Sequence, residues 1–598
     1  MRSSSGSCAV FLLVLSVLAA PAPGAASPAK LALAHQRLEL PGVPVQTLAV
    51  DLDRDGLRDL AVVVASTSWG EVGIEEPMKV DESGTFVDVL TVVPTVLDRR
   101  ELLLFLGAAG GAAGSGGFSA EPLRFELPPT VHAVAAGPTA APLVAWTDDG
   151  VAEIVLASSA PPEGESPREL SLVPRIAART IFAGSSSFLA RSGLIDDLDG
   201  DGDPDLLVPV AGGLEVHLST PEGVEARAAS LVAPPEEEAK EPAGDAGASA
   251  LETEPRRARR PREIRAEVAL PQVIDLTGDH LPDLLYRDTE ADGHGIRVRP
   301  GLGEGRFGAA FDPLPGWSER ASPAAPAADP AGDSDEAPSW EVVWLGDLDG
   351  DGSAEVVTSQ EIPNPKDSMR AELAEAKRPH ARIRVHALGA DGRWTPSPKA
   401  EFKVEGYVFE GGGGDDDGDG EGVGFSFPAG VRDLDGDGKL DLIALSLDFS
   451  LFEAMRVLTT KSIKLGLDFG IYRQGQGLSF RPVPDLDLAG ELRLRLDSLA
   501  LGQLSSFTGD FDGDGRADFV QLGRGRKVTI HRGQPGARYA PTPDLAITLE
   551  REPLDVALVA VTDLDGDGRS DLSVTQPIGG KAIGARAALD LYLSGGRP

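Results

Sequence analysis

The sequence repeats one nine-residue pattern, Asp-x-Asp-x-Asp-Gly-x-x-Asp, along most of its length. Five complete copies begin at Asp51, Asp197, Asp433, Asp510 and Asp563. The segments 347–355 and 275–283 are variants: the first has Glu at position nine, and the second has Thr at position three and His at position six. Such self-similarity indicates a repeat architecture rather than the roughly four domains that 598 residues would otherwise suggest.

The segments that flank each loop repeat as well. A short apolar run precedes a loop, as at 556–561, and a strand-like run follows it, as at 60–64. Alternating segments such as 213–218 and 382–386 then supply further strands. Four short strands per repeat are typical of a β-propeller blade, so the sequence predicts an all-β propeller of four-stranded blades.

The spacing of the loops predicts seven or eight blades. The interval from Asp51 to Asp197 is 146 residues, whereas the others range from 53 to 86, so one unit without an intact loop should lie inside it. Segment 143–156 fits, because it keeps only Asp149, Gly150 and Glu153 of the pattern. We expect the strand at 36–40 to complete the last blade and close the ring, which would remove exposed sheet edges.

The residue types in the loop match the chemistry of calcium, which takes six to eight oxygen ligands. Carboxylates at positions one, three, five and nine and the backbone carbonyl at position seven would supply them, while Gly at position six permits the sharp turn. An EF-hand is excluded, because position twelve is never Glu in these loops and the flanks are β-like.

The predicted calcium ligands fall into six sets, with a weak or lost seventh site at Asp275, Asp279 and Asp283. The six sets are Asp51, Asp53, Asp55, Leu57 and Asp59; Asp197, Asp199, Asp201, Asp203 and Asp205; Asp347, Asp349, Asp351, Ser353 and Glu355; Asp433, Asp435, Asp437, Lys439 and Asp441; Asp510, Asp512, Asp514, Arg516 and Asp518; and Asp563, Asp565, Asp567, Arg569 and Asp571.

The N-terminus predicts export. A basic start, an apolar run at 8–20 and small residues up to Ala26 are typical of a signal peptide over residues 1–26, and the run is too short to span a membrane. The mature protein, residues 27–598, would then be periplasmic, held at the cell surface or released. Cys8 is the only cysteine, so metal sites rather than disulfides would have to staple the mature chain.

Charge restricts the partners. The formal net charge of -39 would repel nucleic acid and anionic bilayers, and no segment predicts an integral membrane span. We expect a monomer with a protein or polysaccharide ligand. Segments at about 234–265, 318–339 and 405–424 are rich in acidic residues, Gly, Pro or Ala, which predicts disordered insertions.

The loops and the apolar runs after them resemble the FG-GAP/VCBS repeats of integrin alpha-subunit propellers and of bacterial secreted proteins. The resemblance covers nearly the whole mature chain, although the Phe-Gly and Gly-Ala-Pro words of the family are poorly kept, with one fragment at Phe307-Gly308. It implies a propeller whose calcium loop joins the first two strands of a blade at its rim. Family members bind proteins or glycans, or accompany enzymes as non-catalytic modules.

Two function classes remain open. The sequence contains no His-Glu-x-x-His zinc motif, no Gly-x-Ser-x-Gly elbow and no phosphate loop, which favours a non-catalytic binding or adhesion scaffold. The alternative is a secreted hydrolase or lyase that acts on polysaccharide through an acid pair among the many carboxylates. Trp69, Trp317, Trp340 and Trp394 are candidate sugar platforms, whereas Trp344 should pack in the core.

Overall fold

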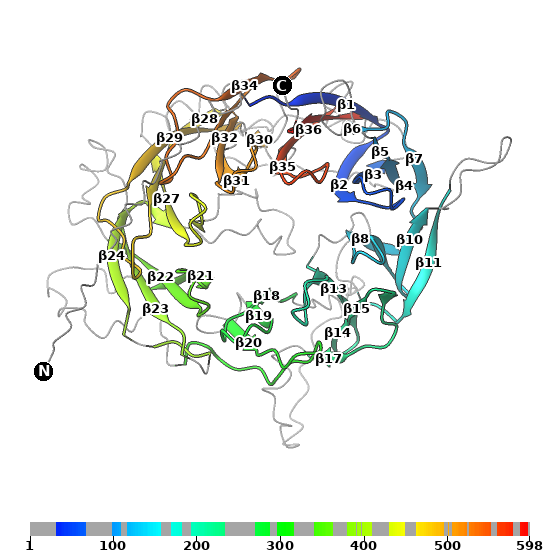
Figure 1. The fold of residues 1–598 in the computed structure, drawn as a ribbon, viewed down its shortest axis with the longest axis horizontal. Coiled ribbons are helices and arrows are strands. Elements are labelled where there is room, and N and C mark those ends of the chain that lie inside the picture. The colour runs from blue at the N-terminus through cyan, green and yellow to red at the C-terminus, as the bar shows by residue number, and fades with distance from the viewer. Residues whose placement is uncertain are drawn as a thin grey trace, which may run out of the picture.

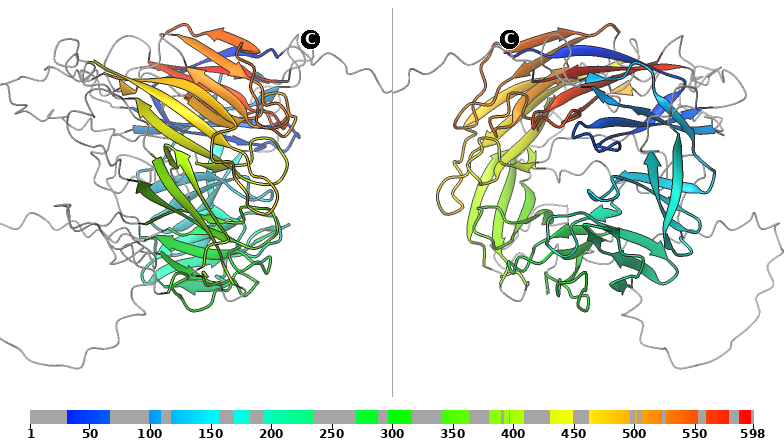
Figure 2. Two further views of the ribbon diagram at one scale, coloured as in Figure 1. Left: turned by 90° about the vertical axis from the view of Figure 1, so that its left-hand side faces the viewer. Right: turned by 45° about the vertical axis from the view of Figure 1, so that its right-hand side comes forward.

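The fold was analysed in a computed structural model, and it is a closed ring of β-sheets (Figures 1 and 2). The structure describes residues 31–66, 99–108, 117–156, 169–181, 193–233, 270–287, 296–315, 340–362, 380–389, 392–395, 397–408, 430–448, 462–495, 500–501, 505–522, 526–551, 559–577 and 586–595. Within these residues there is no helix, and therefore none that could cross a bilayer.

Eight blades follow one another around the ring, and the first four are built from residues 43–315. Blade 1 consists of β2 (Val43–Val50), β3 (Asp59–Ser66), β4 (Arg99–Phe105) and β7 (Leu123–Glu126). Blade 2 consists of β8 (Val131–Ala136), β9 (Leu143–Thr147), β10 (Gly150–Leu156) and β11 (Leu170–Ala177). Blade 3 consists of β12 (Ile195–Asp196), β13 (Asp205–Val210), β14 (Gly213–His217) and β17 (Ser230–Val232). Blade 4 has three strands, β18 (Gln272–Ile274), β19 (Asp283–Arg287) and β20 (Ile296–Arg299).

The remaining blades complete the circle. Blade 5 consists of β21 (Glu341–Gly346), β22 (Glu355–Ile362), β23 (His380–Ala387) and β24 (Ala400–Glu405). Blade 6 has six strands among the described residues, β25 (Tyr407–Val408), β26 (Val431–Arg432), β27 (Asp441–Asp448), β28 (Ser462–Tyr472), β29 (Leu486–Arg495) and β30 (Ala500–Leu501). Of these, β26, β27, β28 and β29 correspond to the first to fourth strands of the other blades, and β25 and β30 are additional. Blade 7 consists of β31 (Ser505–Gly509), β32 (Asp518–Leu522), β33 (Lys527–His531) and β34 (Leu545–Thr548). Blade 8 consists of β35 (Val559–Thr562), β36 (Asp571–Pro577), β37 (Ala587–Leu593) and β1 (Ala34–Leu40).

Two short hairpins lie outside the blades, β5 (Gly107–Ala108) with β6 (Gly117–Phe118) and β15 (Ser219–Thr220) with β16 (Gly223–Val224). Figure 1 shows the first strand toward the centre and the last toward the outside, as for β2 and β7, β21 and β24, and β31 and β34. All strand pairs within the blades are antiparallel, as in β2–β3 and β3–β4. The propeller predicted from the sequence is therefore confirmed, with eight blades, six of which have four strands.

The core lies between the blades rather than inside any one of them. The second strands are the most buried, and every residue of β13 is covered. One cluster joins Trp146 of blade 2 to Leu206 of blade 3 and Leu284 of blade 4. The Trp146 indole donates a hydrogen bond to the Leu207 carbonyl oxygen at 3.0 Å. Apolar residues on both faces of the second strands are explained by this packing, because each blade is covered on two sides.

The N-terminal strand closes the ring, as the sequence predicts. β1 pairs with β37 in antiparallel register, from Ala34 opposite Leu593 to Leu40 opposite Ala587. Leu38 and Leu40 are each 1% exposed and pack in a cluster that spans blades 8 and 1. The last blade therefore combines strands from both ends of the chain (Figure 1).

We predict that Leu40→Ala lowers the free energy of unfolding by about 3 kcal/mol, because it opens a cavity in this closure. Glu39→Ala is the matched control: the Glu39 side chain is 63% exposed, and its loss should change stability by less than about 1 kcal/mol. Urea unfolding of the two variants measures the difference. Equal stabilities would show that the closure contributes little.

Blade 2 is the unit without an intact loop, but the sequence places its strands incorrectly. We expected Asp149 and Gly150 to occupy the loop between the first and second strands. Asp149 lies instead in the turn between β9 and β10, the second and third strands, and Gly150 is the first residue of β10. Segment 137–142 takes the place of the loop, and it is closed by a hydrogen bond from the Gly137 amide to the Pro142 carbonyl oxygen at 3.0 Å. An Asp-Gly pair favours any tight turn, so it did not identify which turn it forms.

Several expectations lie outside the described residues: the signal peptide over 1–26 with Cys8, and the insertions at 234–265 and 318–339. The insertion predicted at 405–424 is wrong at its start. Glu405 ends β24, and Tyr407 and Val408 form β25, which pairs with β27. The apolar Tyr-Val pair adds an edge to blade 6, and residues 409–424 lie outside the described part.

Candidate metal centres

Each of the seven Asp loops joins the first strand of a blade to the second, as expected from the family resemblance. All seven share one backbone conformation, in which positions four and six have positive φ. The two positions are Arg54 and Gly56; Gly200 and Gly202; Gly278 and His280; Gly350 and Gly352; Gly436 and Gly438; Gly513 and Gly515; and Gly566 and Gly568. Glycine adopts this region without strain, which explains its use at both positions. The sequence reasoning identified only the requirement at position six.

The position-one carboxylate organises the turn. In loop 510–518, Asp510 Oδ1 accepts hydrogen bonds from the amides of Gly513 at 2.8 Å and Asp514 at 3.1 Å, and Oδ2 accepts one from Gly515 at 2.8 Å. The bond from position six to position one recurs in all seven loops. The position-five carboxylate likewise accepts the amide of position seven in all seven loops.

The position-nine acid is a buried clamp between the loop and the third strand. Asp518, which is fully buried, accepts the amide of Phe511 at 2.8 Å on Oδ2 and the amide of Gly533 at 2.7 Å on Oδ1. The same pair of acceptor bonds recurs in the other loops, except that the Lys399 ammonium replaces the second amide at Glu355. Each oxygen keeps a second lone pair, so this clamp is compatible with the predicted ligand role.

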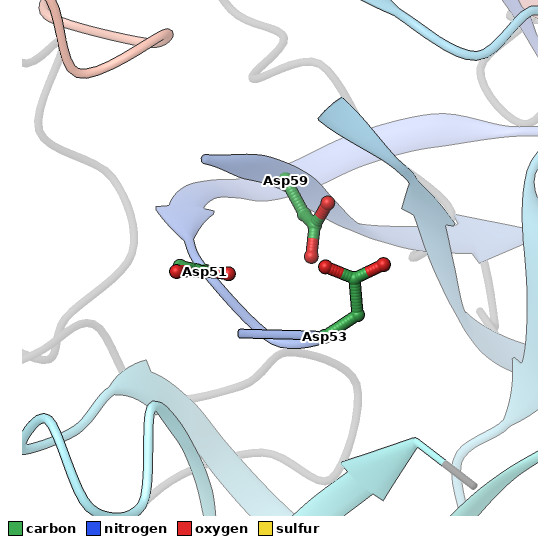
Figure 3. Close-up of side chains that lie close together, drawn as sticks. All are labelled: Asp51, Asp53 and Asp59. Atoms are coloured by element: carbon green, nitrogen blue, oxygen red, sulfur yellow. The ribbon is translucent and has the colours of Figure 1, made fainter. Parts of the chain in front are cut away.

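Carboxylate oxygens from three positions converge in each of five loops. They lie within 4.8 Å of one another at positions one, three and nine in loops 51–59, 197–205 and 433–441, and at positions one, three and five in loops 347–355 and 510–518. Figure 3 shows Asp51, Asp53 and Asp59 around the turn between β2 and β3, where the Asp53 and Asp59 carboxylates face each other. Several Asp clusters of this ring could therefore bind metal ions.

The carboxylates at position three have room for a cation ligand bond. The Oδ1 atoms of Asp349, Asp435 and Asp512 are buried and, within the described part of the chain, accept no hydrogen bond. A buried acceptor without a partner costs roughly 1–3 kcal/mol, and a hard cation bound by that oxygen would remove the cost. The donor set consists of oxygen atoms alone in these loops, which fits calcium better than zinc or copper.

Burial acts on the position-nine acids in the same direction in every loop. Desolvation, opposed by backbone hydrogen bonds and reinforced by neighbouring carboxylates, raises the pKa of Asp205 to about 6. It raises the pKa of Asp441, of Asp518 and of Asp571 to about 7. Burial disfavours the charged form of these acids. A cation bound beside them would favour the charged form and so lower the pKa again.

The degraded loop 275–283 keeps the fold of the others but has fewer carboxylates. His280 adopts φ 66° at position six, and its amide donates to Asp275 Oδ2 at 2.9 Å. At position three Thr277 replaces Asp, and its buried Oγ1 has no hydrogen-bond partner within the described residues. Backbone geometry thus survives the loss of one acidic ligand, which agrees with a weak or lost site.

Neighbouring loops touch one another around the ring. A Cβ added at position-four Gly278, Gly350 or Gly436 would lie 2.6, 2.6 or 2.9 Å from the position-six carbonyl oxygen of the next loop. Backbone hydrogen bonds also run from Leu440 to Leu348 (3.0 Å), from Ala517 to Leu434 (3.2 Å) and from Ser570 to Asp510 (2.7 Å). At these three positions glycine is therefore favoured by contact as well as by conformation.

The remaining predictions have mixed outcomes. The position-seven residues lie on the loops, and their role as carbonyl ligands stays a prediction. Trp340 is 3% exposed under the Arg384 guanidinium, 4.1 Å from the ring centre, so it is not an exposed sugar platform. Trp344 packs against a core cluster, as expected. The Trp394 indole donates to the Pro315 carbonyl oxygen at 3.2 Å, while Trp69 and Trp317 lie outside the described residues.

Comparison with known proteins finds one family match, in the last two Asp loops. Residues 510–574, which hold the loops of blades 7 and 8, match the FG-GAP-like repeat. No curated protein matches the sequence significantly. Among solved structures, a lectin from Agrocybe aegerita that recognises non-reducing terminal N-acetylglucosamine is similar at 14% identity, with a TM-score of 0.36, over 78% of this chain and 96% of the lectin. The exotype rhamnogalacturonan lyase YesX is similar at 11% identity, with a TM-score of 0.19, over 94% of this chain and 72% of the lyase. The chain is thus an eight-bladed β-propeller that carries an FG-GAP-like repeat at residues 510–574.

Proposed function

We propose that this protein is an exported, calcium-binding β-propeller that acts, as a monomer, as a non-catalytic binding or adhesion scaffold for a protein or polysaccharide ligand. The observation that supports it most directly is the set of buried position-three oxygens without hydrogen-bond partners, at Asp349, Asp435 and Asp512, beside other carboxylates. Calcium uses oxygen ligands in a flexible shell of six to eight, which suits repeated clusters of side-chain and backbone oxygens.

In the calcium-bound state, the carboxylates at positions one, three, five and nine would hold the ion, and the position-seven carbonyl would add one oxygen. The ion would balance the negative charge of the buried carboxylates, and it would fix the connection between the first and second strands. The sequence pattern of the N-terminus supports export, where calcium is abundant and where the mature chain, without cysteine, has no disulfide.

Metal content tests this proposal. We expect elemental analysis of the purified mature protein in millimolar calcium to find about six calcium ions per chain, one for each intact loop. Asp435→Asn should remove about one ion. Asp149→Asn, in the turn between β9 and β10, is the matched control and should leave the count unchanged. A protein without bound divalent ions would contradict the proposal.

A second candidate function has a specific observation in its favour. A hollow of about 450 Å³ at the β9–β10 end of blade 2 is lined by His132, Asp148, Arg179 and Thr180, and the His132 imidazole contacts the Asp148 carboxylate. A histidine paired with a carboxylate could serve as an acid–base pair in a polysaccharide hydrolase or lyase. The Asp loops connect the first and second strands of a blade, whereas the β9–β10 turn connects the second and third. Because the strands are antiparallel, the hollow lies at the opposite end of the blades from the Asp loops.

A glycan array and a reducing-sugar assay, both run with calcium, separate the two functions. Retention of a glycan without product supports the scaffold. Release of product that is lost in His132→Ala but kept in His35→Ala, an unrelated histidine on β1, would support the enzyme.

The raised pKa values predict how stability depends on pH. An acid with a raised folded-state pKa stabilises the fold while it is protonated, and that stability is lost as the pH rises through the folded pKa. Without calcium, the melting temperature should therefore fall as the pH rises from about 4, the ordinary pKa of Asp, to about 7, the upper end of the raised pKa values of Asp205, Asp441, Asp518 and Asp571. With calcium the fall should disappear. Calorimetry at constant ionic strength measures both, and parallel curves would contradict the prediction.

A further inference from the structure

In two Asp loops an arginine from outside the loop pairs with the acid at position three. In blade 6 the Arg473 guanidinium pairs with Asp435 Oδ2, and in blade 7 Arg532 Nη1 lies 3.2 Å from Asp512 Oδ2. Both acids occupy position three. Both arginines directly follow the third strand of their blade, since β28 ends at Tyr472 and β33 ends at His531.

The backbone and neighbouring acids hold these arginines in place. The Arg532 amide donates to Asp544 Oδ2 at 2.9 Å, and its Nε and Nη2 atoms donate to Asp544 Oδ1 at 3.1 and 3.0 Å. The Arg473 amide makes the corresponding bond to Asp485 Oδ2 at 3.1 Å. The Asp435 side chain is only 5% exposed and the Arg473 side chain is 36% exposed, so the carboxylate end of the pair is shielded from solvent. A shielded pair is screened less than one at the surface.

Loop 197–205 lacks such a partner. No Lys or Arg among the described residues forms an ion pair with Asp199 or Asp205, and Asp205 accepts hydrogen bonds from the amides of Leu198 and Ser219. Asp203 at position seven adds another negative charge. The ring therefore contains loops whose negative charge is partly neutralised by an arginine and at least one loop whose charge is not.

We propose that Arg473 and Arg532 are internal counter-cations, which lower the calcium affinity of loops 433–441 and 510–518 and hold those loops in shape when calcium is absent. The inference rests on the proposed calcium function. In each loop one position-three oxygen binds the guanidinium, while Oδ1 of the same carboxylate is buried without a hydrogen-bond partner in the described structure. A divalent ion bound at Oδ1 would lie close to the guanidinium, and their repulsion weakens binding. The protein then has two classes of calcium site.

The test is a calcium titration of the mature protein against a chromophoric chelator, with Arg473→Gln as the main variant. The wild-type isotherm should show a tight and a weak class of sites. Arg473→Gln should move one site from the weak to the tight class, with an affinity gain of about tenfold, because one positive charge is removed beside the ion. Arg473→Lys keeps the charge and should retain the wild-type isotherm.

Arg481→Gln is the matched control. Arg481 pairs with Asp485 at 2.8 Å, in the same connection between β28 and β29, but its side chain is 71% exposed and does not reach the loop. The Arg481→Gln substitution should change neither the calcium-binding isotherm nor the stability of the protein. In chelator, Arg473→Gln should melt at a lower temperature than Arg481→Gln, because the unpaired Asp435 is then buried without a counter-charge.

Arg532→Gln repeats the test in blade 7 and does not depend on whether Arg473→Gln folds. If the wild type binds calcium and both glutamine variants give its isotherm unchanged, the counter-cation inference is wrong while the calcium function stands. If the wild type binds no calcium, the proposed function itself fails.

Discussion

Removal of calcium with EDTA should lower the melting temperature of the mature protein by about 10 °C. With a dissociation constant of ~0.1 mM, at the tight end of the range for extracellular modules, ~1 mM calcium stabilises the fold by ~1.4 kcal/mol per site. Six sites together contribute about 8 kcal/mol, which is comparable to the stability of a whole domain. Because this free energy acts at the connection between the first and second strands, its loss should weaken every blade that has an intact loop.

Differential scanning calorimetry in 1 mM calcium and in excess EDTA measures this shift. Magnesium added back in place of calcium is the control, and it should restore little, because magnesium prefers fewer protein oxygens and keeps its own water. Equal melting temperatures in calcium and in EDTA would show that the Asp clusters are structural turns that need no ion.

Asp205→Ala should destabilise the calcium-loaded protein by about 3 kcal/mol before any loss of metal is counted. The substitution leaves two buried amides without an acceptor: those of Leu198, 2.9 Å from Asp205 Oδ2, and Ser219, 2.7 Å from Oδ1. Each orphaned donor costs roughly 1–3 kcal/mol. The substitution also removes a buried carboxyl group, whose desolvation raises its pKa to about 6. Removal of this desolvation penalty offsets part of the cost.

Asp203→Ala in the same loop is the matched control. It removes the same charge, but it keeps the backbone carbonyl that we predict as the ligand and breaks no side-chain clamp. Its effect on the free energy of unfolding should stay within about 0.5 kcal/mol, as for most surface substitutions. Urea unfolding of both variants in calcium provides the comparison, and similar losses in the two would contradict the clamp.

Periodic features of the sequence were sufficient to predict most of the fold. The repeated loop predicted the propeller, the long interval after Asp51 indicated a unit without an intact loop while leaving seven or eight blades open, and the spare strand at 36–40 predicted the closure. These predictions succeed because each rests on a pattern that recurs, or on a count of strands that must balance in a closed ring.

Features that depend on contacts between blades could not be predicted in this way. Gly278 and Gly350 at position four pack on the carbonyl groups of Gly352 and Gly438 in the next loop, which lie 74 and 88 residues further along the sequence. Arg473 lies 32 residues after Asp441, and Arg532 lies 14 residues after Asp518, so no fixed spacing marks the arginines. Their common place, directly after the third strand, becomes visible only when the strands are known.

The hydrogen bonds between neighbouring loops bear on how the ring opens. They join the backbones of four consecutive loops, because the amides of Leu440, Ala517 and Ser570 donate to carbonyl oxygens of the preceding loop. Blades 5 to 8 should then open as one cooperative unit, and native-state hydrogen exchange should give these three amides a common free energy of opening. A ligand held anywhere on those blades would slow exchange across all four, so a single binding event could protect nearly half the circle from proteolysis.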